Sequence, residues 1–307
     1  MTALLVVEQC LNGLQLGVML FLMAARLTLV FGIMNLVNLA HGSLYMVGAY
    51  LATTFLRWTG SFVAAVALAL LATLVVGIIV ELTALRTLYE RDHLDQVLAT
   101  FGLILFFNEL VAIVWGRAAL FATVPPALAG HVEVLPGLRY PAYRAMIILV
   151  GLAVAVFLYV LVTRTRLGML IRAGASNRTM VAALGVNIRA LYTLVFGLGA
   201  ALAGLGGLMA GPIYTVQPGM GEEILIPVFV VIVIGGIGSI RGAVVGAVVV
   251  GMVDTLGRAF LKPMLSTVLS PSAADTAGPA LASMVIYLLM AIVLAFRPQG
   301  LFPARGL

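Results

Sequence analysis

The residues that could carry out chemistry in this sequence are few and widely separated. His41, His93 and His131 lie in different segments, and none has a second ligand at the short spacing of a zinc site. Lys262, the only lysine, precedes a proline instead of standing in the Gly-Lys-Ser/Thr sequence of an ATP-binding loop. Cys10 is the only cysteine, so the chain has neither an internal disulfide nor a cysteine metal site. We therefore expect no catalytic residue, no metal and no cofactor, and we expect any ATP hydrolysis to occur in another polypeptide.

Three charged residues interrupt strongly apolar segments, namely Arg26, Glu109 and Asp254. A charge at membrane depth is costly unless it faces protein or water. We expect Arg26 to face the protein interior and to contact an acid, a carbonyl or water, with Glu109 or Asp254 as candidates to neutralise it. Because proton-coupled carriers use such groups, this possible intramembrane charge cluster supports an alternative function, a proton-coupled secondary carrier or a channel for a small solute.

A polar segment between residues 35 and 45 interrupts a long apolar run with two amides, an imidazole and a glycine. Polar groups at membrane depth need protein or a water-filled path around them. The segment is either a broken helix that borders a translocation path or an interfacial turn between two helices. If it borders a path, the residues that line the path are Asn35, Asn38, His41, Gly42 and Tyr45.

A second glycine-rich segment occupies residues 235–242 and reads Gly-Gly-Ile-Gly-Ser-Ile-Arg-Gly. Without a lysine it is a weak signal for phosphate binding. Small residues in membrane helices favour close packing or a helix break. Packing or a turn is one interpretation and direct contact with substrate is the other. Under the second interpretation the path also includes Gly236, Gly238 and Ser239.

A short helix is predicted in the most basic loop of the chain. Ser176 or Asn177 has the side chain to cap its start, and Gly185 suits its end. The helix is either an ordinary connection or a docking point for a partner protein. The candidate docking residues are Ser176, Asn177, Arg178, Met180, Val181, Ala182, Ala183, Leu184 and Gly185.

The elements that position all these residues are predicted to be membrane-spanning helices. The 307 residues are 63% hydrophobic and 9% charged, whereas soluble domains carry about 25% charged residues. Apolar runs of about 20 residues, long enough to span a bilayer, recur along the chain. We predict an all-α fold, a single transmembrane domain over residues 1–307 with about eight or nine spans and with broken or short helices near the centre. The predicted spans are 10–34, 42–57, 61–85, 96–115, 144–163, 190–211, 223–238, 241–261 and 279–296.

The positive charges indicate how the chain is oriented in the membrane. Residues 163–190 contain five arginines and no acid, and cytoplasmic loops carry an excess of Lys and Arg. This loop is therefore predicted to be cytoplasmic, and alternation of the spans also places the C-terminus in the cytoplasm. The net charge of +6 follows the same rule, because the basic residues are scattered without the interleaved aromatic residues of a nucleic-acid surface.

Four stretches together resemble the permeases of branched-chain amino acid ABC transporters, the LivH type. They occur in the expected order over nearly the whole chain, at Leu27–Tyr50, Ala182–Asn187, Phe229–Ala243 and Arg297–Phe302. Arg26 and Arg241 depart from the family pattern, in which a glycine and a proline are common at these places.

The resemblance implies a permease subunit of an importer in a bacterial inner membrane. The subunit would form half of the pathway for branched-chain amino acids or related small polar solutes. The implied partners are a second homologous permease subunit, two cytoplasmic ATPase subunits, a periplasmic substrate-binding protein and the surrounding lipid. The short helix near residues 177–184 would then dock into an ATPase subunit.

Overall fold

The computed structural model describes residues 3–34, 38–89 and 91–302, and most of them are helical. The long helices are α1 (Ala3–Met34), α2 (His41–Thr59), α3 (Phe62–Thr83), α4 (His93–Trp115), α5 (Ala142–Arg164), α8 (Ile188–Ala210), α9 (Met220–Gly235), α10 (Ile240–Leu265) and α11 (Pro271–Phe296). The shorter elements are η1 (Leu85–Leu88), η2 (Pro126–Leu128), β1 (His131–Leu135), β2 (Leu138–Pro141), α6 (Arg166–Ser176) and α7 (Arg178–Ala183).

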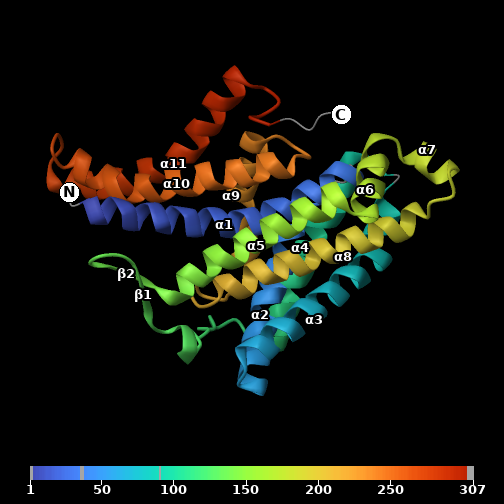
Figure 1. Cartoon of the computed structure of the whole chain (residues 1–307), viewed down its shortest axis with the longest axis horizontal. Helices are drawn as coiled ribbons and strands as arrows, with labels where there is room; N and C mark the ends of the chain where they lie inside the picture. Colours follow the sequence, from blue (N-terminus) through green and yellow to red (C-terminus); the bar gives the residue numbers. More distant parts are fainter. Residues whose placement is uncertain (1–2, 35–37, 90, 303–307) are drawn as a thin grey trace.

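Helices α1 and α8 form the centre of the bundle and are the most deeply buried of the long apolar helices. Helix α1 packs along α10 and also contacts α8 and α5, while α2 contacts α8, α3, α9 and α4. Figure 1 shows α1 through the middle, with α10 and α11 on one side and α2 and α3 on the other. The central helices therefore position Asn38, Ala40 and His41, at the start of α2, in the protein interior.

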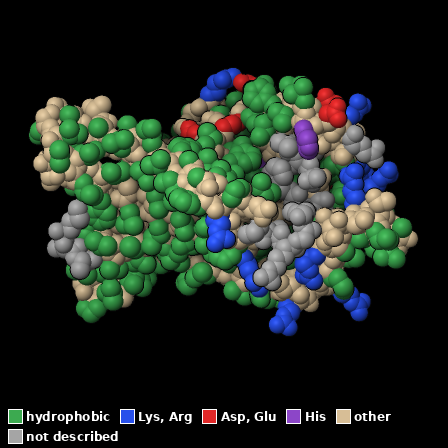
Figure 2. Space-filling view, turned by 90° about the horizontal axis from the view of Figure 1, so that it is seen from above, with side chains coloured by type: hydrophobic (Ala, Val, Ile, Leu, Met, Phe, Trp, Pro, Cys, Tyr) green, Lys and Arg blue, Asp and Glu red, His purple; other side chains and the backbone are tan. Residues whose placement is uncertain are grey.

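The two ends of the bundle differ. One end carries α6, α7 and the start of α8, whereas the opposite end carries the start of α1, the β1–β2 hairpin and the link from α10 to α11 (Figure 1). In Figure 2, Lys and Arg side chains gather in the half of this face toward α6 and α7, and hydrophobic side chains cover most of the other half. This charge asymmetry agrees with a cytoplasmic position for the α6–α7 end.

Seven of the described helices are long and apolar enough to cross a membrane, namely α1, α3, α4, α5, α8, α10 and α11. The predicted count of eight or nine spans is not confirmed, because α2 and α9 do not meet this criterion. Helix α9 has 16 residues, which gives a length of about 24 Å against a hydrocarbon core of about 30 Å. These two short, largely buried helices pack against each other.

Large hydrophobic side chains such as Leu71, Leu98 and Phe106 are exposed on the outside of the bundle. Soluble monomers rarely expose so much contiguous apolar surface. Together with the seven apolar helices, this exterior makes the chain a multi-pass membrane protein.

The predicted helical bundle is confirmed as mostly helical, and two details of the structure differ from the prediction. The connection between α4 and α5 contains an antiparallel hairpin, with Glu133 opposite Arg139, so the fold is not purely α-helical. β-branched Val132 and Val134 favour a strand, and Gly137 takes the positive φ that the turn requires. Helix α11 begins at Pro271 rather than at residue 279, because proline is well suited to a first helical turn. The prediction had followed only its apolar part.

Glycines allow several helices to approach backbone to backbone. A Cβ atom added to Gly48 in α2 would lie 2.3 Å from the Cα atom of Gly204 in α8. A Cβ atom on Gly17 in α1 would lie 2.7 Å from the carbonyl oxygen of Ala247 in α10. Such contacts are typical of membrane helices, which associate through close packing of small residues.

Candidate functional site

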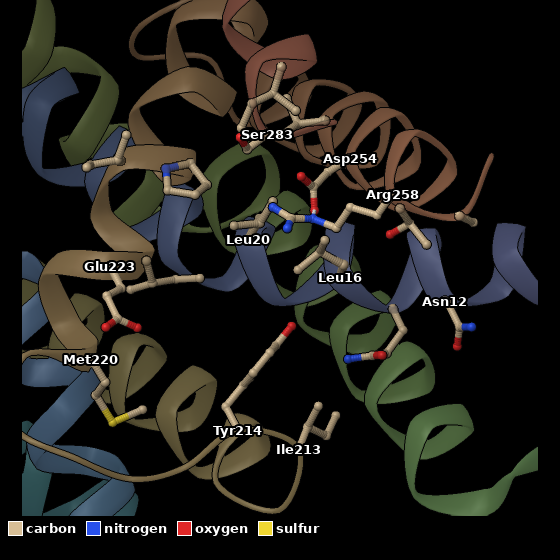
Figure 3. A pocket seen from close by; sticks show the side chains of 18 of the residues that line it. Asn12, Leu16, Leu20, Ile213, Tyr214, Met220, Glu223, Asp254, Arg258 and Ser283 are labelled. Atoms are coloured by element: carbon tan, nitrogen blue, oxygen red, sulfur yellow. Dashed lines mark hydrogen bonds and ion pairs between the residues drawn. The ribbon is translucent and has the colours of Figure 1, made fainter. Parts of the chain in front are cut away.

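A polar cavity of about 990 Å³ lies toward the end of the bundle that carries the hairpin. Its walls come from α1, α2, α9, α10 and α11, together with the start of α5 and the loop between α8 and α9. Figure 3 shows side chains from these separate segments converging on one space. A concave space of this size with converging polar groups is the usual form of a small-molecule site.

One wall of the cavity is a polar face of α1. Gln9, Asn12 and Gln15 line it at a spacing of three residues, which places them on one side of the helix. The Asn12 side-chain oxygen accepts hydrogen bonds from Arg144 Nη1 at 2.7 Å and from the Tyr140 hydroxyl at 3.2 Å. These bonds join α1 to β2 and to the first turn of α5, so they fix Arg144 at the cavity wall.

Charged residues of both signs line the cavity. Arg258 Nε lies 2.9 Å from an Asp254 carboxylate oxygen one turn earlier in α10, and the other carboxylate oxygen, Oδ1, is buried without a hydrogen-bond partner among the described residues. Glu223 lines the wall formed by α9, and Arg144 lines the wall formed by α5. Two acids and two arginines give the lining no net formal charge, which favours a neutral or zwitterionic ligand over an ion.

Tyr214 in the α8–α9 loop also borders the cavity, and Figure 3 shows its side chain and that of Glu223 directed toward the same space. Burial raises the pKa of the Tyr214 phenol above its usual range. Tyr214 therefore stays neutral at physiological pH and offers a hydroxyl that both donates and accepts.

The start of α9 is anchored to α4. Asn108 Nδ2 donates to Glu222 Oε1 at 2.7 Å, and the Gly219 backbone N–H donates to Asn108 Oδ1 at 3.1 Å. These two bonds hold the first turn of α9 in place, so the orientation of the neighbouring Glu223 toward the cavity is set by contacts outside the cavity.

Arg26 is fully buried at the centre of the bundle. Its Nη1 donates to the His41 carbonyl oxygen at 2.9 Å, and its guanidinium lies 5.2 Å from the centre of the Phe196 ring. The prediction that Arg26 faces the interior and contacts a carbonyl is therefore confirmed. Its Nε and Nη2 find no acceptor within the described part of the chain.

The structure does not bring Arg26, Glu109 and Asp254 together. Glu109 binds the exposed Arg117 at 2.9 Å, and Asp254 binds Arg258. Each acid pairs with an arginine that lies within eight positions of it in the sequence. The predicted charge cluster is thus replaced by two local ion pairs and one buried arginine.

The described part of the polar segment after α1, residues 38–45, faces protein rather than lipid. Asn38 and His41 are almost completely buried, and the Asn38 side-chain oxygen accepts from the Ala40 N–H at 2.9 Å. Gly42 packs against Gly221, where a Cβ atom on Gly42 would lie 2.0 Å from the Gly221 carbonyl oxygen.

Asn35 lies outside the described residues. Of the predicted path residues in this segment, Tyr45 lines the cavity.

The glycine-rich segment forms the turn between α9 and α10. Gly236 and Gly238 both have positive φ, and the Ser239 hydroxyl oxygen accepts from the Gly242 N–H at 3.1 Å at the start of α10.

The segment after α11 packs on this turn, where the Leu301 and Phe302 N–H groups donate to the carbonyls of residues 234 and 235 at 2.8 and 2.9 Å. None of the three predicted residues lines the cavity, so their contacts favour the packing interpretation.

The predicted short helix is present as α7. Asn177 caps its start, since its side-chain oxygen accepts from the Met180 N–H at 2.9 Å, and Gly185 follows it with φ of 86°. Ser176 is the last residue of α6 rather than a cap. Val181 is buried, whereas Met180 and Leu184 are exposed. The side chains of Arg178, Ala182 and Ala183 are also exposed.

Sequence reasoning missed most of the cavity residues. Asn12, Arg144, Tyr214, Glu223 and Arg258 lie near predicted span ends, where polar residues are common and carry little information. The three-residue spacing of polar side chains at positions 9, 12 and 15 was the available signal, because it places a polar stripe on an otherwise apolar helix.

Membrane-crossing helices around a neutral polar cavity define a membrane transport protein. Residues 9–294 match the family described as branched-chain amino acid transport system, permease component. The chain therefore belongs to this family, which is a family of transport permeases and not of enzymes or proton-coupled carriers. The carrier alternative drawn from the intramembrane charges is accordingly set aside.

Curated relatives cover nearly the same length. The high-affinity branched-chain amino acid transport system permease protein BraD of Pseudomonas aeruginosa is 30% identical over 96% of this chain and 94% of its own length. The high-affinity permease protein LivH of Escherichia coli K12 is 28% identical over 86% of this chain, and a probable LivH of Methanocaldococcus jannaschii is 28% identical over 81%. No solved structure matches the chain.

Proposed function

We propose that this permease forms half of an ATP-driven import pathway for branched-chain amino acids in a bacterial inner membrane. The observation that carries the proposal is the polar cavity of no net formal charge, set into a bundle whose exterior is apolar. The names of BraD and LivH support the substrate class, since both proteins are named as high-affinity branched-chain amino acid transport system permeases.

The cavity is the outer vestibule of this pathway. Tyr45 lines its wall, and His41, one helical turn earlier in α2, is buried against Arg26. Asn38, His41 and Gly42 thus form the closed inner boundary of the vestibule. The glycine contact between α2 and α9 lets these two short helices slide past each other when the boundary opens.

Energy for opening comes from partner proteins at the opposite end of the bundle. A periplasmic binding protein delivers the substrate to the vestibule, and a second homologous permease completes the pathway. Two cytoplasmic ATPase subunits bind at the α6–α7 end, where basic residues gather (Figure 2). In this arrangement residues 1–307 act as one permease domain with a cytoplasmic C-terminus.

Reconstitution tests the function directly. The chain is purified with its second permease and ATPases, placed in liposomes, and supplied with the binding protein and radiolabelled L-leucine. We expect uptake that requires ATP inside the vesicle and the binding protein outside. A proton gradient without ATP should give no uptake. Leucine uptake by this chain alone, driven by a proton gradient, would overturn the proposal.

A further inference from the structure

Two charges in the cavity lack an oppositely charged partner among the described residues. Arg144 Nη1 donates to the neutral side-chain oxygen of Asn12 at 2.7 Å, and no carboxylate of residues 3–34, 38–89 or 91–302 lies within 4.0 Å of the arginine nitrogens. Glu223 is exposed in the first turn of α9 and forms no ion pair with these described residues within the same limit. The other two cavity charges, Asp254 and Arg258, neutralise each other at 2.9 Å.

The two acids in the first turn of α9, Glu222 and Glu223, differ in their contacts. Glu222 is partly buried and accepts a hydrogen bond from Asn108, which ties α9 to α4. Glu223 faces the cavity without such a bond (Figure 3). A helix start is stabilised by either acid through the helix dipole, so helix stability does not account for a second acid turned toward the cavity.

We propose that Arg144 and Glu223 bind the two ends of an amino acid zwitterion, with Arg144 at the carboxylate and Glu223 at the ammonium group. A guanidinium forms strong paired hydrogen bonds with a carboxylate, and a carboxylate accepts charge-assisted bonds from an ammonium group. The inference rests on the proposed function, because the zwitterion would be the transported substrate.

The rest of the lining fits an amino acid with an aliphatic side chain. Leu16, Leu20 and Ile224 line the same cavity, and burying a branched aliphatic side chain against such residues is favourable because it removes apolar surface from water. The uncharged Tyr214 hydroxyl borders the space as a further hydrogen-bonding group. The site therefore combines two separated charges of opposite sign with an apolar wall.

A cysteine-protection experiment tests this pair inside the assembled importer. The single cysteine Cys10 is replaced by alanine, and Thr215→Cys places a reporter on the cavity wall, where Thr215 is exposed. A small thiol reagent is applied to the complex without binding protein. The labelling rate is measured with L-leucine, with leucinamide, which lacks the carboxylate, and with 4-methylpentanoate, which lacks the ammonium group.

We expect L-leucine to slow labelling at concentrations about tenfold lower than either analogue requires, since each analogue loses one charge-assisted contact. In Arg144→Gln, the leucine concentration needed for protection should rise to the leucinamide concentration needed in the protein with both native charges, and Arg144→Lys should restore part of the difference. In Glu223→Gln, the leucine concentration needed for protection should rise to the 4-methylpentanoate concentration needed in the protein with both native charges. Arg139→Gln and Glu109→Gln are charge-matched controls outside the cavity lining and should leave protection unchanged.

Equal protection by all three compounds in the reporter protein with both native charges, or no protection, would overturn the inference without any charge variant having to fold. Unchanged leucine preference in both Gln variants would also overturn it. Leucine uptake in the reconstituted importer is measured in parallel. Uptake without selective protection refutes this site and leaves the proposed function standing, whereas absence of leucine uptake refutes the proposed substrate itself.

Discussion

At the scale of single residues, Arg26 is the most unusual side chain in the structure. It is fully buried, its aliphatic part packs against Gly199, and a Cβ atom on that glycine would lie 2.8 Å from Arg26 Cγ. Only Nη1 has a hydrogen-bond acceptor within the described ranges. A buried charge with unsatisfied donors destabilises a fold relative to an apolar side chain of similar volume.

We predict that Arg26→Met stabilises the purified permease by about 1–3 kcal/mol, because methionine fills the space without buried donors. The measurement is thermal unfolding in detergent, followed by size-exclusion chromatography. Arg26→Gly is the comparison variant, and it should gain less because it leaves a void. A fall in the midpoint temperature for Arg26→Met would instead show that the guanidinium holds α1 and α2 together.

At the scale of elements, glycines set how closely the central helices approach. The contact of α2 with α8 at Gly48 and Gly204 leaves no room for a side chain. Gly102 in α4 offers the contrast, because nothing lies within 4 Å of a Cβ atom added there. Both glycines lie in the middle of a helix, so a valine has the same effect on helix propensity at each position. Any difference between the two variants therefore reports on packing.

Gly48→Val is predicted to destabilise the bundle by about 3 kcal/mol or more, since overpacking against backbone cannot be relieved by a side-chain rotation. Gly102→Val should change stability by less than about 1 kcal/mol. The yield of monodisperse protein and its thermal midpoint are compared for the two variants. Similar losses at both positions would contradict the close approach of α2 and α8.

Helix α7 is the element through which we expect ATPase contact. Met180 in α7 and Leu184, which caps the end of α7, are exposed and lie four residues apart, so they lie on the same side. Apolar residues on one face suit insertion of a short helix into a groove on a partner. The capping bond of Asn177 and the glycine at position 185 keep α7 separate from the spans.

Ala183→Glu and Leu184→Asp are therefore predicted to reduce co-purification of the ATPase and coupled leucine uptake by at least about tenfold, while insertion stays normal. Thr163→Asp, an exposed change on α5 outside α7, is the control. Wild-type association and uptake in both α7 variants would assign coupling to another segment, with residues 85–96 next in line.

At the scale of the whole molecule, the long helices were predictable from apolar periodicity and length, and the predicted spans coincide with the observed helices to within a few residues at most ends. The cavity was not predictable. Asn12 and Arg144 meet across 132 positions of sequence, and no local pattern encodes that meeting. The interior position of Arg26 could be predicted, because the free-energy cost of a charge in lipid follows from the residue and its apolar neighbours in the sequence. Its partner, the His41 carbonyl, could not be predicted, because that contact depends on how α1 and α2 pack.

The orientation of the bundle gives a further prediction. In a Cys10→Ala background, Ala129→Cys in the α4–α5 connection should react with a membrane-impermeant maleimide in spheroplasts, and Thr179→Cys in α7 should not. In inside-out vesicles the pattern should reverse, because the α6–α7 loop carries the excess of arginine. Labelling of both cysteines from the same side would contradict the arrangement of the two ends.

The backbone hydrogen bonds from residues 301 and 302 to the end of α9 have a consequence for biogenesis. The carbonyls of Ile234 and Gly235 receive these N–H donors only after α11 has been synthesised and inserted. While the ribosome is still translating α11, the turn between α9 and α10 therefore carries two acceptors without their final donors. A chain released before residue 301 therefore leaves the carbonyls of Ile234 and Gly235 without these two donors.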